Sequence, residues 1–186
     1  MKVHLKNVKS LNIPNTLTMI RIIIIPVFTT TIIYKRYNYA LYLFAIAAVT
    51  DFLDGLLARL TNQKTALGTF LDPLADKFLL VTSFITLSVF GLIPKWLAIT
   101  VISRDIIVLT GWLILYLSTG MKKVEPSVLG RATIWIQSIF IAFVLVRMNF
   151  FLFPEFYLAL QWSTAGITIL SGLHYIYREL KHIHAI

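Results

Sequence analysis

The sequence predicts an all-α integral membrane protein, a bundle of six transmembrane helices preceded by a short amphipathic segment. The 186-residue chain is 58% hydrophobic and only 13% charged, and its mean hydropathy of +0.82 is well above that of soluble domains. Several uninterrupted apolar runs reach the roughly 20 residues that a helix needs to cross the hydrocarbon core. These runs do not show the two-residue alternation expected of membrane-spanning strands.

The first 12 residues, MKVHLKNVKSLN, are expected to form a juxtamembrane segment outside the bundle. Apolar residues alternate there with Lys2, Lys6 and Lys9, a pattern typical of a basic amphipathic segment on an anionic membrane surface. Residues 13–186 then form one six-helix transmembrane domain, because the connections between the apolar runs are short.

The six spans are expected at residues 14–34, 38–60, 72–91, 95–118, 128–148 and 155–177. Taken alone, Asp72 at the start of the third span would fit a purely structural N-cap, with Pro73 as the first helical residue. Pro26 falls inside the first span and predicts a kink there. Other prolines lie near the starts of spans one, four and six, where a missing amide donor costs least: Pro14, Pro94 and Pro154. Spans one, five and six are expected to be replaceable by other apolar helices without loss of most of the predicted features.

Positive charge is distributed unevenly between the two ends of the spans. One end has only Lys35, Arg36, Lys95 and Arg147. The other end collects Lys2, Lys6, Lys9, Arg59, Lys64, Lys77, Lys122, Lys123, Arg131, Arg178 and Lys181. The positive-inside rule therefore predicts that both termini are cytoplasmic, in the plasma (inner) membrane if the source is bacterial. Because this pattern explains the net charge of +9, no nucleic-acid partner is expected.

Four aspartates are concentrated in one stretch, DFLDGLLARLTNQKTALGTFLDPLAD, at residues 51–76. Asp51 and Asp54 share a face of span two, and Asp72 and Asp76 are one turn apart in span three. An aspartate at the centre of a membrane span costs about 2.5–3.5 kcal/mol, so these carboxylates need compensation. An all-oxygen carboxylate site suits Mg²⁺ or Mn²⁺, and two such ions could clamp a pyrophosphate.

Small residues and an arginine accompany the aspartates. Gly55 and Ala58 place no large side chain beside the carboxylates, so a flat group such as a nucleobase could approach the helix backbone there. Gly68 would allow the same close approach in the connection. Arg59 can pair with phosphate oxygens. Each feature alone also fits helix packing or an ordinary ion pair. Their joint occurrence favours a binding site on the cytoplasmic side.

The stretch consists of the pattern DxxDGxxAR, a spacer of eight residues and the pattern GxxxDxxxD, and it matches every fixed position of both patterns. It resembles the signature of the CDP-alcohol phosphatidyltransferase family. The segment IPNTLTMIR is similar to the family's N-terminal segment. The resemblance implies a two-metal enzyme, with Asp51, Asp54 and Asp72 as ligands and Asp76 as both ligand and general base. An acceptor hydroxyl would attack the β-phosphoryl group of CDP-diacylglycerol and release CMP. A homodimer is expected, and the CDP-lipid would be lined by Asn15, Thr18, Arg21, Gly55, Ala58, Arg59 and Gly68.

Two further arginines indicate an anion pocket for the acceptor. Arg104 lies in the middle of span four, and Arg131 lies near the start of span five. Adjacent helical residues point about 100° apart, so Arg104 and Asp105 are not expected to share a face. A phosphorylated alcohol would use both arginines. The stretches SRDIIVLTG and LGRAT also resemble the glycerol-phosphate branch of the family, which favours glycerol 3-phosphate as acceptor.

Several alternatives stay open. Phosphatidylglycerol, giving cardiolipin, and inositol phosphate also carry a phosphate that would suit the two arginines. Membrane prenyltransferases combine aspartates, Mg²⁺ and diphosphates, but they resemble larger bundles with two separated aspartate motifs. A cation or proton pathway is the non-enzyme alternative, which would require polar groups to continue toward the other membrane face. The absence of cysteine excludes thiolate metal ligands.

Overall fold

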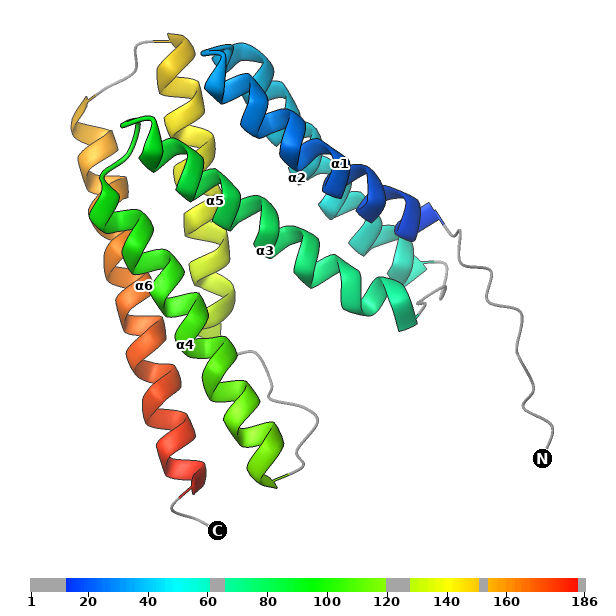
Figure 1. Cartoon of the computed structure of the whole chain (residues 1–186), viewed down its shortest axis with the longest axis vertical. Coiled ribbons are helices and arrows are strands. Elements are labelled where there is room, and N and C mark those ends of the chain that lie inside the picture. The colour runs from blue at the N-terminus through cyan, green and yellow to red at the C-terminus, as the bar shows by residue number, and fades with distance from the viewer. Residues whose placement is uncertain (1–12, 61–65, 120–127, 151–153, 184–186) are drawn as a thin grey trace, which may run out of the picture. The chain divides into compact units, whose positions relative to one another are not determined.

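Six α-helices make up the described part of the protein, which was analysed as a computed structural model (Figure 1). The structure describes residues 13–60, 66–119, 128–150 and 154–183. Within these ranges, some side chains lie outside the described set, namely those of residues 13–15, 17, 52–60, 66–74, 115, 116, 118, 119, 154 and 179–183. The amphipathic segment predicted for residues 1–12 therefore lies outside the described residues. The helices are α1 (Ile13–Ile33), α2 (Tyr37–Leu60), α3 (Ala66–Val89), α4 (Lys95–Thr119), α5 (Val128–Phe150) and α6 (Pro154–Ile183).

Two helix boundaries, the start of α3 and the end of α6, each differ by six residues from the sequence-based expectation. α3 begins at Ala66 rather than at residue 72, so Asp72 and Pro73 lie inside the helix, and the structural alternative in which Asp72 is an N-cap is wrong. Unpaired backbone groups are costly in a membrane, which favours a helix that continues through one proline over a helix that ends there. α6 continues to Ile183, because its last turns contain good helix formers and basic residues that suit a helix C-terminus.

The chain divides into two compact units, residues 1–82 and residues 83–186, and α3 belongs partly to each. In the first unit, α1 and α2 pack against each other as an antiparallel pair (Figure 1). Phe28 and Phe44 contribute a ring contact between them, with centroids 6.2 Å apart, and both side chains are buried. Pro26 lies within α1 as expected, and the kink stays a prediction.

In the second unit, α6 packs against both α4 and α5. Trp96 of α4 meets Trp162 of α6 with ring centroids 5.2 Å apart. Further along the same pair, a Cβ built on Gly111 would lie 2.8 Å from the ring of Tyr175. Because the residue numbers rise together, α4 and α6 run in the same direction. The small residue at position 111 lets the two helices approach closely.

α5 and α6 form an antiparallel hairpin in this unit. Arg147, near the end of α5, places its guanidinium 4.4 Å from the ring centroid of Tyr157, near the start of α6. Phe140 contacts the same tyrosine at 5.9 Å between centroids, and it also stacks on Phe84 at 6.1 Å. The cation–π contact and these ring contacts stabilise the closed end of the hairpin.

Two short connections use a left-handed residue to end a helix. Lys35 has φ 56°, and the amide of Arg36 donates to the carbonyl of Thr31 at 2.8 Å after α1. Gly91 has φ 71°, and the amide of Leu92 donates to the carbonyl of Leu87 at 2.8 Å after α3. Glycine adopts this conformation at no steric cost, whereas lysine is strained in it.

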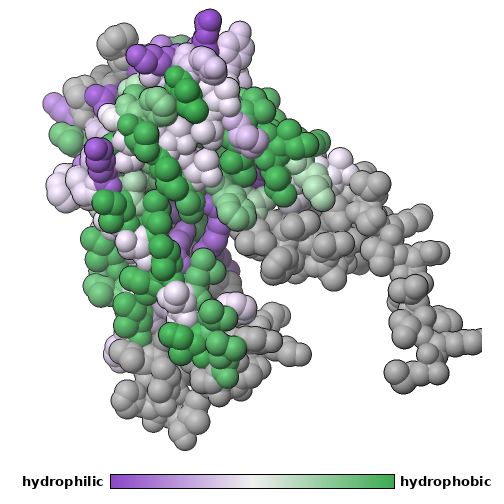
Figure 2. All heavy atoms as spheres, in the orientation of Figure 1, coloured by the Kyte–Doolittle hydropathy of each residue, from purple (hydrophilic) through white to green (hydrophobic). Residues whose placement is uncertain are grey.

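Two of the described helical segments are long and apolar enough to cross a membrane by length and composition, Lys95–Ile114 and Val128–Phe150. A shorter apolar segment covers Thr18–Ile33. Hydrophobic side chains cover much of the exposed surface (Figure 2), including Leu117 at 74% exposure and Trp135 at 68%. Such a surface is unfavourable in water and matches the demands of a lipid environment.

Candidate active site

A buried arginine joins two of the four aspartates in the first unit. The Arg21 side chain, on α1, is fully buried, and its Nη1 lies 3.2 Å from Oδ1 of Asp51 on α2. The same nitrogen donates a hydrogen bond to Oδ1 of Asp76 on α3. The Asp51 and Asp76 side chains are 47% and 34% exposed, so they stay accessible on the side away from Arg21. Three helices thus meet at one guanidinium.

The local sequence explains this placement. Thr18 lies one turn before Arg21 on α1 and is fully buried, so the two residues form a buried polar stripe on a largely apolar helix. Asp51 lies just past the middle of α2, and Asp76 lies midway along α3. A buried guanidinium needs anionic or polar partners, and carboxylates from the two neighbouring helices supply them.

The other two aspartates can be placed only by their backbone. Asp54 lies on α2 one turn after Asp51, and Asp72 lies on α3 one turn before Asp76. Among the side chains that the structure describes, no group of three or more His, Cys, Asp or Glu residues could hold a metal ion. The convergence of Asp51 and Asp76 nevertheless fits a hard divalent cation, because both offer carboxylate oxygens at one place.

The residues expected to line the CDP-lipid lie on the same three helices. Asn15, Thr18 and Arg21 are on α1, and Gly68 is in the first turn of α3 rather than in the connection. The last turns of α2 carry Gly55, Ala58 and Arg59. Of the side chains in this set, those of Thr18 and Arg21 are described, and both are fully buried. Arg21 is directed at Asp51 and Asp76.

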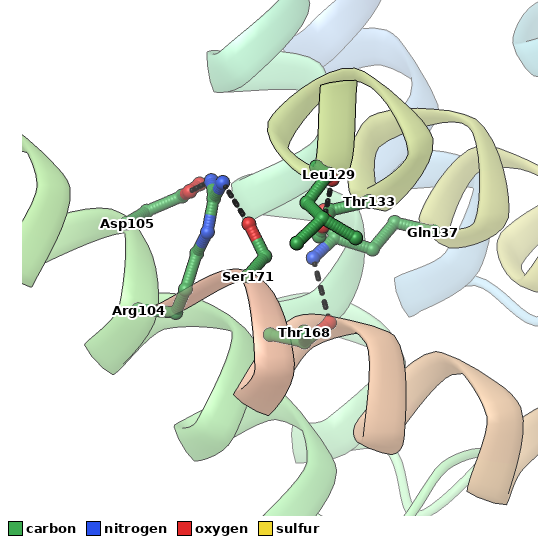
Figure 3. Close-up of polar contacts among 7 residues, drawn as sticks. All are labelled: Arg104, Asp105, Leu129, Thr133, Gln137, Thr168 and Ser171. Atoms are coloured by element: carbon green, nitrogen blue, oxygen red, sulfur yellow. Dashed lines mark hydrogen bonds and ion pairs between the residues drawn. The ribbon is translucent and has the colours of Figure 1, made fainter. Parts of the chain in front are cut away.

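A second buried arginine lies in the second unit. Arg104 of α4 is 9% exposed, and its Nη1 donates to Oδ1 of Asp105 at 2.8 Å (Figure 3). The two neighbours point in different directions around α4, as helix geometry predicts, but they pair all the same because the long, flexible arginine side chain brings its guanidinium to Asp105. Nη2 donates to Oγ of Ser171 on α6 at 2.7 Å, while Nε is buried without a hydrogen-bond partner. The stem of Arg104 packs beside Gly172 of α6, where an added Cβ would lie 3.4 Å from Cγ of Arg104, within ordinary van der Waals contact.

A polar stripe on α6 was missed by the sequence analysis. Its residues are spaced three, four and three apart and are all buried, namely Gln161, Thr164, Thr168 and Ser171. Gln137 of α5 donates to Oγ1 of Thr168 at 3.2 Å, which gives α6 a polar contact with α5 as well as with α4 (Figure 3). The three- and four-residue spacing of these polar residues is the sequence signal from which the stripe could have been predicted. α5 and α6 are therefore not interchangeable with arbitrary apolar helices.

Arg131 does not join this cluster. It is exposed near the start of α5, whereas the hydrogen bonds of Arg104 go to α4 and α6. Within the described residues, the two arginines share no partner. The structure therefore brings together Arg21, Asp51 and Asp76 in one unit and Arg104, Asp105 and Ser171 in the other.

Comparison with known proteins identifies relatives along most of the chain. Residues 11–170 match the CDP-alcohol phosphatidyltransferase family. The Bacillus subtilis CDP-diacylglycerol–glycerol-3-phosphate 3-phosphatidyltransferase is 36% identical over 182 residues, which cover 88% of this chain and 93% of that protein. The cardiolipin synthases (CMP-forming) of Rattus norvegicus and Homo sapiens are 34% and 33% identical over 94% of this chain. The chain spans just under two thirds of their lengths, 63% and 64%.

Proposed function

The chain belongs to the CDP-alcohol phosphatidyltransferase family, and we propose that it transfers the phosphatidyl group of CDP-diacylglycerol to glycerol 3-phosphate and releases CMP. The observation that carries this proposal is the convergence of Asp51 and Asp76 at one place, on two different helices and within the family's signature. The similarity to the Bacillus subtilis enzyme along 93% of its length supports glycerol 3-phosphate as the acceptor.

In the proposed reaction, Asp76 accepts the proton of the acceptor hydroxyl while that oxygen attacks the β-phosphorus of CDP-diacylglycerol. The bond between this phosphorus and the oxygen of the CMP group breaks, and CMP leaves with the bonding electrons. The partial exposure of the Asp76 side chain, 34%, is compatible with access of a hydroxyl to its carboxylate. No covalent enzyme intermediate is required.

A divalent cation fits the residues present, because Asp51, Asp54, Asp72 and Asp76 offer carboxylate oxygens on two neighbouring helices. We assign these four residues to two Mg²⁺ or Mn²⁺ ions, which would neutralise charge on the pyrophosphate when bound. The binding surface for CDP-diacylglycerol comprises Asn15, Thr18, Arg21, Gly55, Ala58, Arg59 and Gly68.

Arg104 and Arg131 are the proposed contacts of the acceptor phosphate. The buried Nε of Arg104, which has no hydrogen-bond partner, supports this role because a buried guanidinium donor favours an anionic acceptor. Ser171 and Asp105 hold the rest of the guanidinium in one orientation. The exposed Arg131 could attract an anion from solvent.

The protein is an integral membrane protein, as its membrane-embedded family and its two long apolar helices indicate. In the proposed topology, residues 13–186 form one catalytic domain in which all six helices cross the membrane, with both termini and the aspartates on the cytoplasmic side. The excess of lysine and arginine at one end of the spans supports this orientation. Assembly as a homodimer is proposed from the family resemblance.

The test is CMP release by the purified protein in detergent with CDP-diacylglycerol and Mg²⁺, with one acceptor in each reaction. We expect release with glycerol 3-phosphate, and loss of release in EDTA and in Asp76→Asn. Absence of release with every acceptor would refute the proposed activity and would make an ion-flux assay the next measurement.

A second acceptor is favoured by a specific observation. The mammalian relatives named cardiolipin synthase (CMP-forming) match 94% of this chain, which supports the alternative reaction of this chain in which phosphatidylglycerol is the acceptor and cardiolipin the product. The chemistry at Asp76 would be unchanged, since phosphatidylglycerol also offers a free hydroxyl. CMP release with phosphatidylglycerol and not with glycerol 3-phosphate would favour this alternative. Inositol phosphate is tested in the same series.

A further inference from the structure

The position of Arg21 requires an explanation beyond ligand binding. Its side chain has no exposed surface, and its Nη1 contacts carboxylates from both α2 and α3. Burying a charge that lacks a partner is strongly unfavourable, so the guanidinium and the two aspartates depend on each other. Each carboxylate would otherwise face the other across a short distance, because both lie within reach of a single nitrogen atom.

The contacts of Arg21 with Asp51 and Asp76 join protein atoms directly and need no bridging metal ion. Among the three described side chains joined by these contacts, one positive and two negative charges leave a net charge of −1. A divalent ion would therefore still be attracted. A carboxylate also has a second oxygen, so contact with Arg21 does not by itself exclude a metal from the same aspartate.

We propose that Arg21 is a resident cation that keeps Asp51 and Asp76 in place when no divalent ion is bound. Arg21 is then a positioning residue for the acidic site, and it fastens α1 to α2 and α3 between catalytic cycles. The inference that a divalent ion later shares these carboxylates rests on the proposed function. The charge compensation itself rests on the contacts of Arg21.

The experiment compares the thermal unfolding of wild-type protein, Arg21→Gln and Arg21→Lys in detergent, each in EDTA and in excess Mn²⁺. Arg21→Gln removes the charge and leaves two aspartates side by side, so its Tm in EDTA should fall by on the order of 5 °C. Mn²⁺ should raise the Tm of this variant by more than it raises that of the wild-type protein. Arg21→Lys should behave like the wild-type protein, because both contacts use one nitrogen and an ammonium can replace it in charge.

Two controls separate charge compensation from a general packing defect. Arg36→Gln removes an exposed cation in the connection after α1 and should leave both Tm values unchanged. The double variant Arg21→Gln, Asp51→Asn removes the cation together with one of its anions. It should unfold in EDTA at a higher temperature than Arg21→Gln alone. If Arg21→Gln yields no folded protein, recovery of folded protein in the double variant supports the same conclusion.

The proposal is overturned if Arg21→Gln has the wild-type Tm in EDTA, or if adding Asp51→Asn recovers neither stability nor folded protein. Equal destabilisation by Arg21→Lys and Arg21→Gln would also overturn it, since charge would then not be the important property. A wild-type protein that binds no divalent ion at these aspartates would give a different result. In that case Mn²⁺ would leave the wild-type Tm unchanged, while the EDTA comparison of the variants would still decide the role of Arg21.

Discussion

Arg104 offers the sharpest test of the acceptor pocket, because its replacement has separable effects on stability and on binding. Arg104→Met retains much of the apolar stem and removes the charge and the hydrogen bonds to Asp105 and Ser171. The Asp105 side chain is only 14% exposed, so it would lose its cation in a buried environment. Breaking one side of a buried ion pair costs about 3–5 kcal/mol.

The double variant Arg104→Met, Asp105→Asn removes both charges and should recover most of that stability. It therefore allows kinetics to be measured on folded protein. Loss of a hydrogen bond to a charged group costs about 1.5–3 kcal/mol, which corresponds to a roughly 10- to 150-fold change in affinity. We expect the KM for glycerol 3-phosphate to rise within this range and the KM for CDP-diacylglycerol to change much less.

The matched control is Ser171→Ala, which keeps the Arg104 charge but removes the hydrogen bond that orients it. Its acceptor KM should rise less than that of the double variant. CMP release measured over a range of each substrate gives both constants. An unchanged acceptor KM in the folded double variant, or an equal rise for both substrates, would refute the assignment of Arg104 to the acceptor.

The remaining predictions concern the general base and two features of the backbone. Asp76→Asn should retain the fold and lose turnover, because an amide cannot accept the acceptor proton; near-normal CMP release would exclude the base role. Gly111→Ala should lower the free energy of unfolding by about 1–3 kcal/mol, because the added Cβ would lie 2.8 Å from a tyrosine ring. Gly166→Ala is the control, since a Cβ at that position meets nothing within 4 Å. Thermal unfolding of Gly111→Ala beside Gly166→Ala checks this, and equal Tm values would contradict it. Lys35→Gly should stabilise the protein by about 1 kcal/mol by relieving the left-handed conformation at φ 56°, and a lower Tm would show that the strain is unimportant.

The features of this protein that one local sequence pattern specifies were predicted correctly. The long apolar runs predicted helices in the right order, and most boundaries lie within about two residues of the observed ends. The aspartate spacing was sufficient to indicate the family, because helical periodicity brings such residues to one face. Sequence reasoning misplaced the start of α3, where Asp72 and Pro73 look like a helix start but lie inside the helix.

Side-chain partners could not be predicted in the same way. The sequence placed Arg21 near the CDP-lipid, but its contacts with Asp51 and Asp76 depend on how three helices pack. The pairing of Arg104 with Asp105 did not follow from helix geometry alone, since it depends on the flexibility of the arginine side chain. Ser171 carried no sequence signal of its own apart from the polar spacing on α6.

The sequence by itself determined the membrane environment, the six helices and the family, because these depend on composition, periodicity and a fixed motif within one stretch of chain. Only the tertiary structure decided which cation compensates which carboxylate. That choice depends on distances of a few ångströms between residues far apart in sequence, such as Arg21 and Asp76. Coulomb and hydrogen-bond energies in a buried environment change strongly over such distances.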